Sequence, residues 1–280
     1  MKKVISRIIV AILLLLFIGS VGAILFILKQ YRDDEAVYGQ AAQRFTMEND
    51  PAAEPEGSKE ECAPIVVDFE ALKKENEDVI GWIYCEDTVI DYPVLRGEDN
   101  DYYLHHTYDR KSSISGSIFV DTNNRPGFVD SNTVIYGHHM KNKSMFATIS
   151  NWAEQEYYEE HPIMWLLTPE QDYKIVLFSE YTTSAYSDTY LMYQEPCPEL
   201  NEYLKKAAKK SNFRSDAQSE EQLDGNARYV LLSTCAYVFD DARDVLHGKL
   251  VPVNSAGGVP VAPGEGAVSG IDAGEAAAGQ

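Results

Sequence analysis

The chain has 280 residues, a formal net charge of −20 at pH 7 and a hydrophobic content of 45%. This acidic balance argues against a nucleic-acid-binding surface, which needs clustered Lys and Arg. It favours solubility, or attraction to a basic partner. The length allows one or two domains. Because both ends and the stretch after the N-terminus look unlike a core, we expect one domain of ordinary size.

The N-terminal region contains an uncharged segment at residues 8–28 in which nothing is more polar than Ser20. Its 21 residues are enough to span a bilayer. Lys2, Lys3 and Arg7 precede it, so we expect residues 1–7 in the cytoplasm and the following domain outside. The alternative is a cleaved signal peptide, whose apolar region is usually about 7–15 residues long. The greater length here favours an uncleaved membrane anchor.

An acidic stretch follows at residues 29–65, with prolines inside it and apolar periodicity only around 36–45. We interpret it as a partly helical stalk that links the anchor to a folded domain at residues 66–253. At the start of that domain, the pattern at residues 66–80 predicts a short helix that Gly81 ends.

Short apolar runs separated by turn residues fill most of the domain and predict strands. They lie at residues 82–84, 89–94, 117–120, 133–136, 163–167, 173–183, 229–233 and 245–253. Many short strands of this kind are typical of a closed or nearly closed β structure.

One amphipathic helix is predicted inside the domain, at residues 198–211, between two of the strands. Its apolar positions share one face: Leu200, Tyr203, Leu204 and Ala207. The C-terminal residues 254–280 consist mainly of Gly, Ala, Pro and Ser, and we expect them to be disordered.

The most informative segment is residues 231–235, Leu-Leu-Ser-Thr-Cys, which brings a thiol to the end of an apolar strand. Arg243 follows eight residues later, just before the next apolar run, so two adjacent strands would place Cys235 and Arg243 side by side. A reactive cysteine needs a neighbouring cation or base. Arginine cannot lose its proton, so it can stabilise an oxyanion but cannot act as the base. A surface ion pair of Arg243 with a nearby aspartate is the alternative.

A base is available at residues 136–140, Tyr-Gly-His-His-Met. Gly137 allows a tight turn, so that one imidazole can project into a cleft. In a strand, His138 and His139 would face opposite sides, and the residues alone do not decide between them.

These motifs resemble those of a known family. Residues 231–235 are similar to the TLxTC signature of sortases, and 136–140 with the later Ser-Met-Phe at 144–146 resembles the histidine segment of class B sortases. Residues 240–243 and 246–250 resemble the arginine strand of that class, and the resemblance extends over about 66–252. Two positions depart from it. Leu231 replaces the usual threonine, which suggests a packing position, and Asp244 places a carboxylate beside Arg243.

The resemblance implies a mainly β fold with peripheral helices: a sortase-like closed barrel of about eight strands, an N-terminal helix and an inserted helix before the cysteine strand. It assigns Cys235 as the nucleophile, His138 as the general acid and base, and Arg243 as the oxyanion stabiliser. His139 would then pack or form hydrogen bonds. Whether a carboxylate completes a triad stays open. The chemistry needs no metal and no organic cofactor.

The resemblance also implies the substrates of a membrane-anchored, outward-facing transpeptidase. It would cleave the sorting signal of secreted surface proteins after a threonine and transfer the acyl group to an amine of a cell-wall precursor or, less favoured, a pilin lysine. Matching peptide-groove positions are Asn100, Leu104, Tyr190, Leu191, Ser233 and Thr234, for which plain packing is the alternative. A cysteine peptidase or cell-wall hydrolase that uses water is the second hypothesis, and a non-enzymatic surface-binding domain is the third.

Four cysteines, at positions 62, 85, 197 and 235, would lie outside the cell on this topology. Two disulfides are the simplest interpretation in that compartment. A catalytic Cys235 must be free, however, which leaves at most one bridge, and we expect none. No Cys-x-x-Cys spacing is present, which argues against a zinc site.

Overall fold

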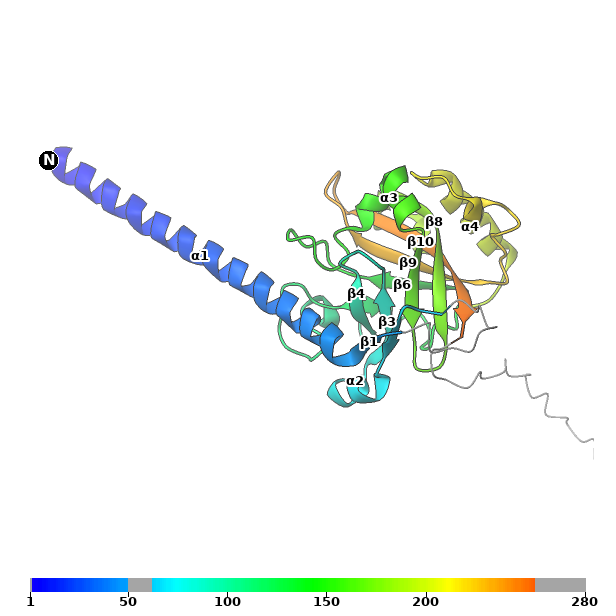
Figure 1. Ribbon diagram of the computed structural model, residues 1–280. Helices are drawn as coiled ribbons and strands as arrows, with labels where there is room; N and C mark the ends of the chain where they lie inside the picture. The colour runs from blue at the N-terminus through cyan, green and yellow to red at the C-terminus, as the bar shows by residue number, and fades with distance from the viewer. Residues whose placement is uncertain (1, 50–61, 255–280) are drawn as a thin grey trace, which may run out of the picture.

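The computed structural model describes residues 2–49 and 62–254. A long helix, α1 (Lys2–Phe45), projects from a β-barrel domain, and smaller helices lie around that barrel (Figure 1). A small two-stranded sheet, β1 (Thr46–Glu48) with β2 (Ile65–Val67), follows the helix. The tail expected beyond residue 254 and part of the expected stalk, 50–61, lie outside the described residues.

Eight of the described strands close a barrel in the order β10-β8-β7-β3-β4-β5-β6-β9. Neighbours are antiparallel except for the parallel pairs β4–β5 and β6–β9. The strands are β3 (Val79–Tyr84), β4 (Asp91–Leu95), β5 (Ile118–Val120), β6 (Asn132–Tyr136), β7 (Ile163–Leu167), β8 (Asp172–Ser184), β9 (Arg228–Cys235) and β10 (Ala242–Val253). The predicted barrel is therefore confirmed, and each strand expected from the sequence is present.

The remaining helical elements are short. They are α2 (Phe69–Glu75), η2 (Tyr102–Leu104), η3 (Ile149–Ala153), α3 (Gln155–Glu160), η4 (Asp188–Tyr190), α4 (Pro198–Lys210) and η5 (Asp216–Gln218). The inserted helix α4 buries its predicted apolar face against Val134, Leu231 and Val245. It thus covers the outer side of the β6–β9–β10 surface, the surface that also contains the cysteine.

The helix predicted at residues 66–80 is wrong in extent. Its first residues pair with β1, and the helix begins only after Asp68, whose carboxylate accepts a hydrogen bond from the amide of Ala71 at 2.9 Å. Gly81 does not end it but lies within β3, where a Cβ atom would meet the carbonyl oxygen of Leu167 at 3.0 Å. The glycine serves close packing of two strands, which sequence reasoning took for a helix stop.

Helix α1 continues without a break from the apolar segment to Phe45, through the first part of the expected stalk. Asp34, Tyr38, Ala41 and Phe45 are buried, and their spacing forms one helical face. The Asp34 carboxylate accepts hydrogen bonds from the Ser113 hydroxyl at 2.7 Å and the Ser115 amide at 3.2 Å. The end of the helix is therefore part of the folded domain.

The N-terminal part of α1 is long and apolar enough to cross a membrane. Its large hydrophobic side chains between residues 4 and 28 are exposed and make no packing contact with the barrel. Transfer of such a surface from water to an apolar environment is favourable, which is consistent with a membrane anchor.

Glu180 on β8 is a buried carboxyl group that gives the fold a pH dependence. Only 1% of the residue is exposed, and burial, with a smaller contribution from Asp244, raises its pKa from 4.5 to about 7. The folded state thus holds a proton that the unfolded state has already released between these two values. The free energy of unfolding should fall as pH rises through this window.

We expect Glu180→Gln to remove this loss, because the amide stays neutral and can still accept the 2.9 Å hydrogen bond from Asn212. Relative to wild type, the variant should gain stability between pH 5 and pH 8, by up to about 3 kcal/mol. Thermal unfolding in detergent at both pH values measures it, with the exposed Glu199→Gln as the control. Equal pH dependence in wild type and Glu180→Gln would contradict the assignment.

Candidate active site

The pairing of β9 with β10 places Cys235 directly opposite Arg243. Directly paired residues of antiparallel strands point to the same side of the sheet. Both side chains therefore lie on the outer surface that α4 covers further along, together with Ser233 and Val245, which form the next such pair. Cys235 is half-buried at the very end of its strand. The juxtaposition expected from the sequence is thus present.

Strand β6 brings the histidine segment to the same end of the barrel. It runs parallel to β9 with Tyr136 next to Ser233, and the amide of Gly137 donates to the Ser233 carbonyl at 3.1 Å. At Gly137 a Cβ atom would lie 2.5 Å from Ile118 and 2.7 Å from Phe146. Only glycine fits this crossing, after which the chain turns out to His138.

The imidazole of His138 is fixed by the backbone. Its Nε2 atom lies 2.8 Å from the carbonyl oxygen of Leu104. A carbonyl oxygen can only accept a hydrogen bond, so Nε2 bears a proton and Nδ1 remains for proton exchange. The partner of this ring is thus a carbonyl group, where a triad would place a carboxylate. The neighbouring His139 instead packs edge-on against Tyr237, with ring centroids 5.3 Å apart.

All three candidate catalytic residues line one cavity of about 450 Å³, which we call the Cys235 cavity. Five of the six expected peptide-binding residues line it too. Its wall consists of Asn100, Leu104, Phe119, Tyr136, Gly137, His138, Ala185, Tyr190, Ser233, Thr234, Cys235 and Arg243. The site assembled from distant parts of the sequence is therefore one continuous hollow.

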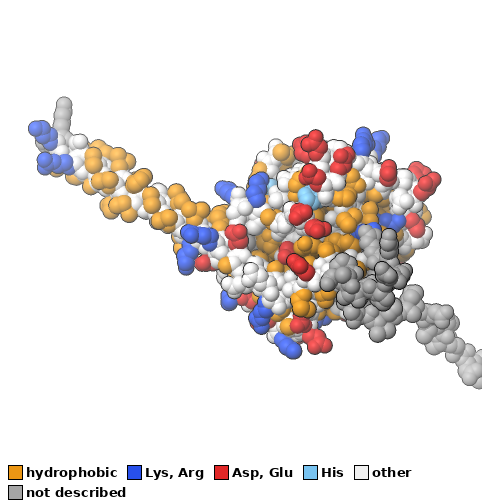
Figure 2. All heavy atoms as spheres, in the orientation of Figure 1, with side chains coloured by type: hydrophobic (Ala, Val, Ile, Leu, Met, Phe, Trp, Pro, Cys, Tyr) orange, Lys and Arg blue, Asp and Glu red, His pale blue; other side chains and the backbone are white. Residues whose placement is uncertain are grey.

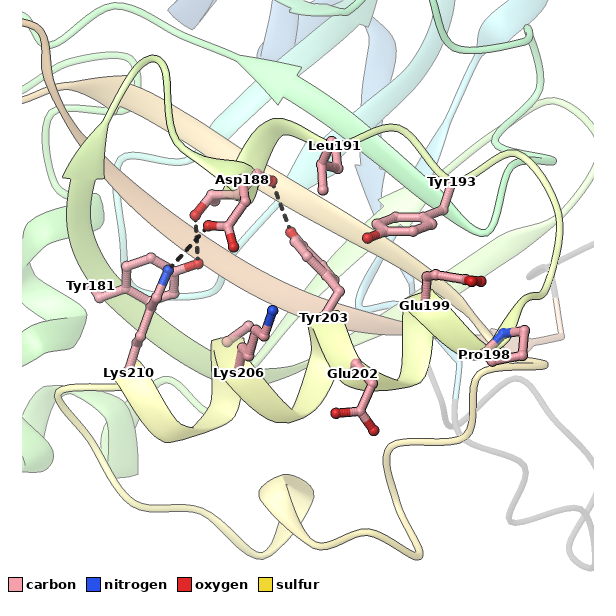
Figure 3. Close-up of a pocket in the computed structure, with 12 residues that line it drawn as sticks. Tyr181, Asp188, Leu191, Tyr193, Pro198, Glu199, Glu202, Tyr203, Lys206 and Lys210 are labelled. Atoms are coloured by element: carbon pink, nitrogen blue, oxygen red, sulfur yellow. Dashed lines mark hydrogen bonds and ion pairs between the residues drawn. The ribbon is translucent and has the colours of Figure 1, made fainter.

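Leu191 is the expected residue that does not line this cavity. Its side chain is 53% exposed and borders a neighbouring cavity of about 370 Å³ between α4 and the segment after β8. The hydroxyl of Tyr203 on α4 donates to the Thr189 carbonyl at 3.0 Å, and Lys210 lies 3.6 Å from Asp188 (Figure 3). These contacts hold the short helix η4, whose last residue, Tyr190, faces the Cys235 cavity.

Tyr190 and Asn100 are held in place by hydrogen bonds. The Tyr190 hydroxyl lies 2.7 Å from the Ser233 hydroxyl, and the side-chain oxygen Oδ1 of Asn100 accepts from the Thr122 amide at 2.9 Å. Burial raises the pKa of Tyr190, and nearby Arg243 opposes that rise. The phenol therefore stays protonated at neutral pH and can donate a hydrogen bond. The Thr234 hydroxyl is buried without a protein partner among the described residues.

Sequence reasoning missed four lining residues as site residues: Phe119, Tyr136, Gly137 and Ala185. Tyr136 and Gly137 belonged to the motif used to find His138, so this signal was available. The Tyr136 hydroxyl donates to the buried Asp121 carboxylate at 2.8 Å, and its ring packs on Phe119 at 5.5 Å. Nothing in the sequence marked Phe119 or Ala185. Phe119 reaches the site because β5 pairs with β6, and Ala185 because its amide donates a hydrogen bond to the Asp241 carbonyl after β9.

Among the described residues, the Arg243 guanidinium forms no ion pair with a carboxylate. Within residues 2–49 and 62–254, no Asp or Glu oxygen lies within 4.0 Å of its guanidinium nitrogens, and Nη1 donates to the Ala242 carbonyl at 2.9 Å. Asp244 points to the opposite face of β10, where it accepts from the Thr182 hydroxyl at 2.7 Å. This alternation removes the direct ion pair with Arg243 that their adjacency in the sequence suggested.

The four cysteines are all free, as expected. Cys85 is buried, and burial raises the pKa of its thiol to about 12, so it stays a protonated, unreactive group. Cys197 immediately precedes α4, and Cys62 lies beside the small sheet. Among the described residues, no three His, Cys, Asp or Glu side chains form a group that could hold a metal ion.

Comparison with known proteins places the chain among proteins named Sortase B. The relative from Listeria monocytogenes is 37% identical over 184 residues, which cover 64% of this chain and 72% of the relative. The relative from Staphylococcus aureus is 33% identical over 189 residues, 66% of this chain and 75% of the relative. No protein-family model matches the chain.

Solved structures agree. A Staphylococcus aureus sortase B–substrate complex matches with a TM-score of 0.61 and 31% identity, over 66% of this chain and 85% of the other. Sortase B from B. anthracis matches with a TM-score of 0.65 and 29% identity, over 80% and 99%.

Gly137 offers a test of the site's geometry. We expect Gly137→Ala to destabilise the fold by about 1–3 kcal/mol through overpacking and to lower activity by displacing His138. Gly39→Ala on α1, where nothing lies within 4 Å of the added Cβ, should be neutral or slightly stabilising. Thermal unfolding and peptide turnover measure both effects. Wild-type behaviour of Gly137→Ala would show that this crossing tolerates a side chain.

Proposed function

The chain belongs to the class B sortases, which are cysteine transpeptidases, and we propose that it acts at the outer face of a membrane on the sorting signals of secreted proteins. The observation that supports this most directly is the convergence of Cys235, His138 and Arg243 on one cavity.

Cys235 is the nucleophile in the proposed first step. Its thiolate attacks the carbonyl carbon of the threonine in the signal, and a carbon–sulfur bond forms. Arg243, opposite it on β10, donates hydrogen bonds to the oxyanion that develops. Among the described residues, no carboxylate lies within 4.0 Å of the Arg243 guanidinium, and its one hydrogen bond goes to the Ala242 carbonyl. This supports the role, because the other donors remain available to an oxyanion.

His138 moves the protons. As imidazolium it protonates the leaving amine when the carbon–nitrogen bond breaks, and a thioester remains on Cys235. The Leu104 carbonyl keeps a proton on Nε2, so the transferred proton leaves from Nδ1. The neutral ring then takes a proton from the incoming amine as the amine attacks the thioester. The new amide forms, the carbon–sulfur bond breaks, and the Cys235 thiolate and the imidazolium are restored.

The rest of the cavity binds the peptide. Asn100, Leu104, Tyr190, Ser233 and Thr234 would contact the residues before the scissile bond. Tyr136 would contribute its ring to the wall, because its hydroxyl proton is donated to Asp121. A structural relative is a sortase B–substrate complex, which supports a peptide as the ligand here. Leu191 would reach the peptide only at the rim of the cavity, because it borders the adjacent hollow.

The anchor determines where the enzyme acts. We propose that residues 8–28 cross the membrane once, with residues 1–7 in the cytoplasm and the barrel outside. The uncharged span and the basic residues before it support this orientation. In that position the enzyme meets both translocating proteins and wall precursors, whose side-chain amine is the proposed acceptor.

Replacement of His138 and replacement of His139 should have very different effects on activity. His138→Ala should lower kcat/KM for a sorting-signal pentapeptide by about 10²–10⁴-fold, as loss of a general acid and base does. His139→Ala should cost far less, because its ring packs on an exposed tyrosine. Peptide cleavage followed by mass spectrometry measures both. The reverse ranking would assign proton transfer to His139.

Amine dependence separates a transpeptidase from a hydrolase. Adding a suitable amine at saturation should raise peptide turnover and give a new amide at the threonine carbonyl, because amines attack thioesters more readily than water does. Cys235→Ala should show neither product, whereas Cys197→Ala, outside the cavity, should behave as wild type. If only free acid forms at an unchanged rate, the enzyme uses water, as a cysteine peptidase or cell-wall hydrolase does.

A further inference from the structure

Exposed apolar side chains gather on two adjacent loops at the rim of the Cys235 cavity. In the β9–β10 loop Tyr237 is 77%, Val238 74% and Phe239 51% exposed, and Tyr186 after β8 is 85% exposed. The two loops are joined by a hydrogen bond from the Ala185 amide to the Asp241 carbonyl at 2.9 Å. Clusters of this kind on a protein surface mark contact with a partner or a membrane.

A basic loop lies close to the β9–β10 loop, because His139, just before it, packs on Tyr237 with ring centroids 5.3 Å apart. It follows the histidine segment and presents Lys141 and Lys143, both exposed. Its residues Asn142 and Ser144 line a small hollow together with Asp34 of α1. In a chain of net charge −20, these lysines are positive charges placed next to the helix that leads to the membrane.

Helix α1 fixes the distance between barrel and bilayer. The uncharged span ends at Leu28, and Asp34 already binds Ser113 and Ser115 of the barrel. At a helical rise of about 1.5 Å per residue this separation is about 9 Å. The headgroup layer of one leaflet is about 5–8 Å thick. Because the helix is continuous, the barrel must lie directly against that layer.

The contact between α1 and the barrel also determines which side of the barrel faces the membrane. In Figure 1 the β9–β10 loop leaves the barrel on the side turned toward the N-terminal part of α1. In Figure 2 the uncharged span ends in basic residues, and further Lys and Arg side chains lie on the barrel surface next to the helix. Ile114, between the two serines that bind Asp34, is also 37% exposed.

We propose that Tyr186 and residues 237–239 form a membrane-docking rim that enters the interfacial layer of the bilayer crossed by α1, with Lys141 and Lys143 at its phosphates. Tyr and Phe are the side chains favoured at this depth, and Lys beside them suits anionic lipids. Asp240 and Asp241 return toward β10 and keep the loop from going deeper. The mouth of the Cys235 cavity then opens at the membrane surface, where a lipid-linked acceptor would arrive. The proposal rests on the membrane anchor of the proposed function.

Tryptophan fluorescence of the full chain in phosphatidylglycerol–phosphatidylcholine vesicles tests this. The native Trp82, Trp152 and Trp165 are buried in the barrel and give a constant background. Val238→Trp and, separately, Tyr186→Trp should each lose about half or more of the added emission to lipids brominated near the headgroup, since interfacial groups sit about 5–10 Å into the boundary. Val129→Trp is the control. Val129 is 41% exposed and precedes β6 at the barrel end opposite His138, so its emission should not change.

Carbonate-resistant flotation and peptide turnover on the same samples separate the possible failures. If the chain is inserted and active but residues 238 and 186 are quenched no more than residue 129, the rim is overturned and the anchor stands. If the chain does not insert, both the anchor and the rim are overturned. Inserted protein that shows quenching without turnover supports the rim and contradicts the proposed chemistry.

Discussion

Strand β9 lies between β6 and β10, and the site depends on these two pairings. The antiparallel pair with β10 sets Cys235 opposite Arg243, and the parallel pair with β6 brings the histidine segment to the same end. A shift of one residue in the β9–β10 register would turn one of the two side chains to the other face. Burial of Leu231 and Val245 against α4 resists such a shift, since it would turn one of them away from the helix and into the barrel. The packing under the helix therefore protects the chemistry at the strand end.

Backbone groups do much of the positioning in this site. The Leu104 carbonyl fixes the ring of His138, the Ser233 carbonyl holds Gly137, and the Thr122 amide holds Asn100. Because these groups belong to the barrel and its short connections, side-chain replacement does not remove them. Carboxylates lie further back: Asp121 holds Tyr136, and Asp244 faces away from Arg243. A site built in this way retains the positive charge of Arg243 opposite Cys235 even though the protein is strongly acidic.

The docking of α1 connects membrane placement to the barrel. A flexible stalk would let the barrel turn freely, whereas a helix whose last turns are buried allows one orientation. If α1 crosses the membrane as proposed, the same contacts that stabilise the barrel, through Asp34 and Tyr38, set which loops meet the bilayer. In the proposed placement, stability of the fold and access to a membrane-bound acceptor depend on one set of interactions.

The sequence by itself determined the eight strands, the inserted helix, the uncharged span and the identity of the three candidate catalytic residues. These follow from local apolar patterning and from motifs, and both are readable along the chain. Only the tertiary structure decided which side chains and backbone groups contact one another. Asp244 is next to Arg243 in the chain yet faces the other side, Gly81 packs two strands, and Leu104 rather than a carboxylate holds His138. The docking of the expected stalk also depended on partners about 80 residues away, at Ser113 and Ser115. The local pattern of apolar residues determines which residues form a strand or a helix. The register of strand pairing and the closure of the barrel determine which other residues that strand or helix contacts.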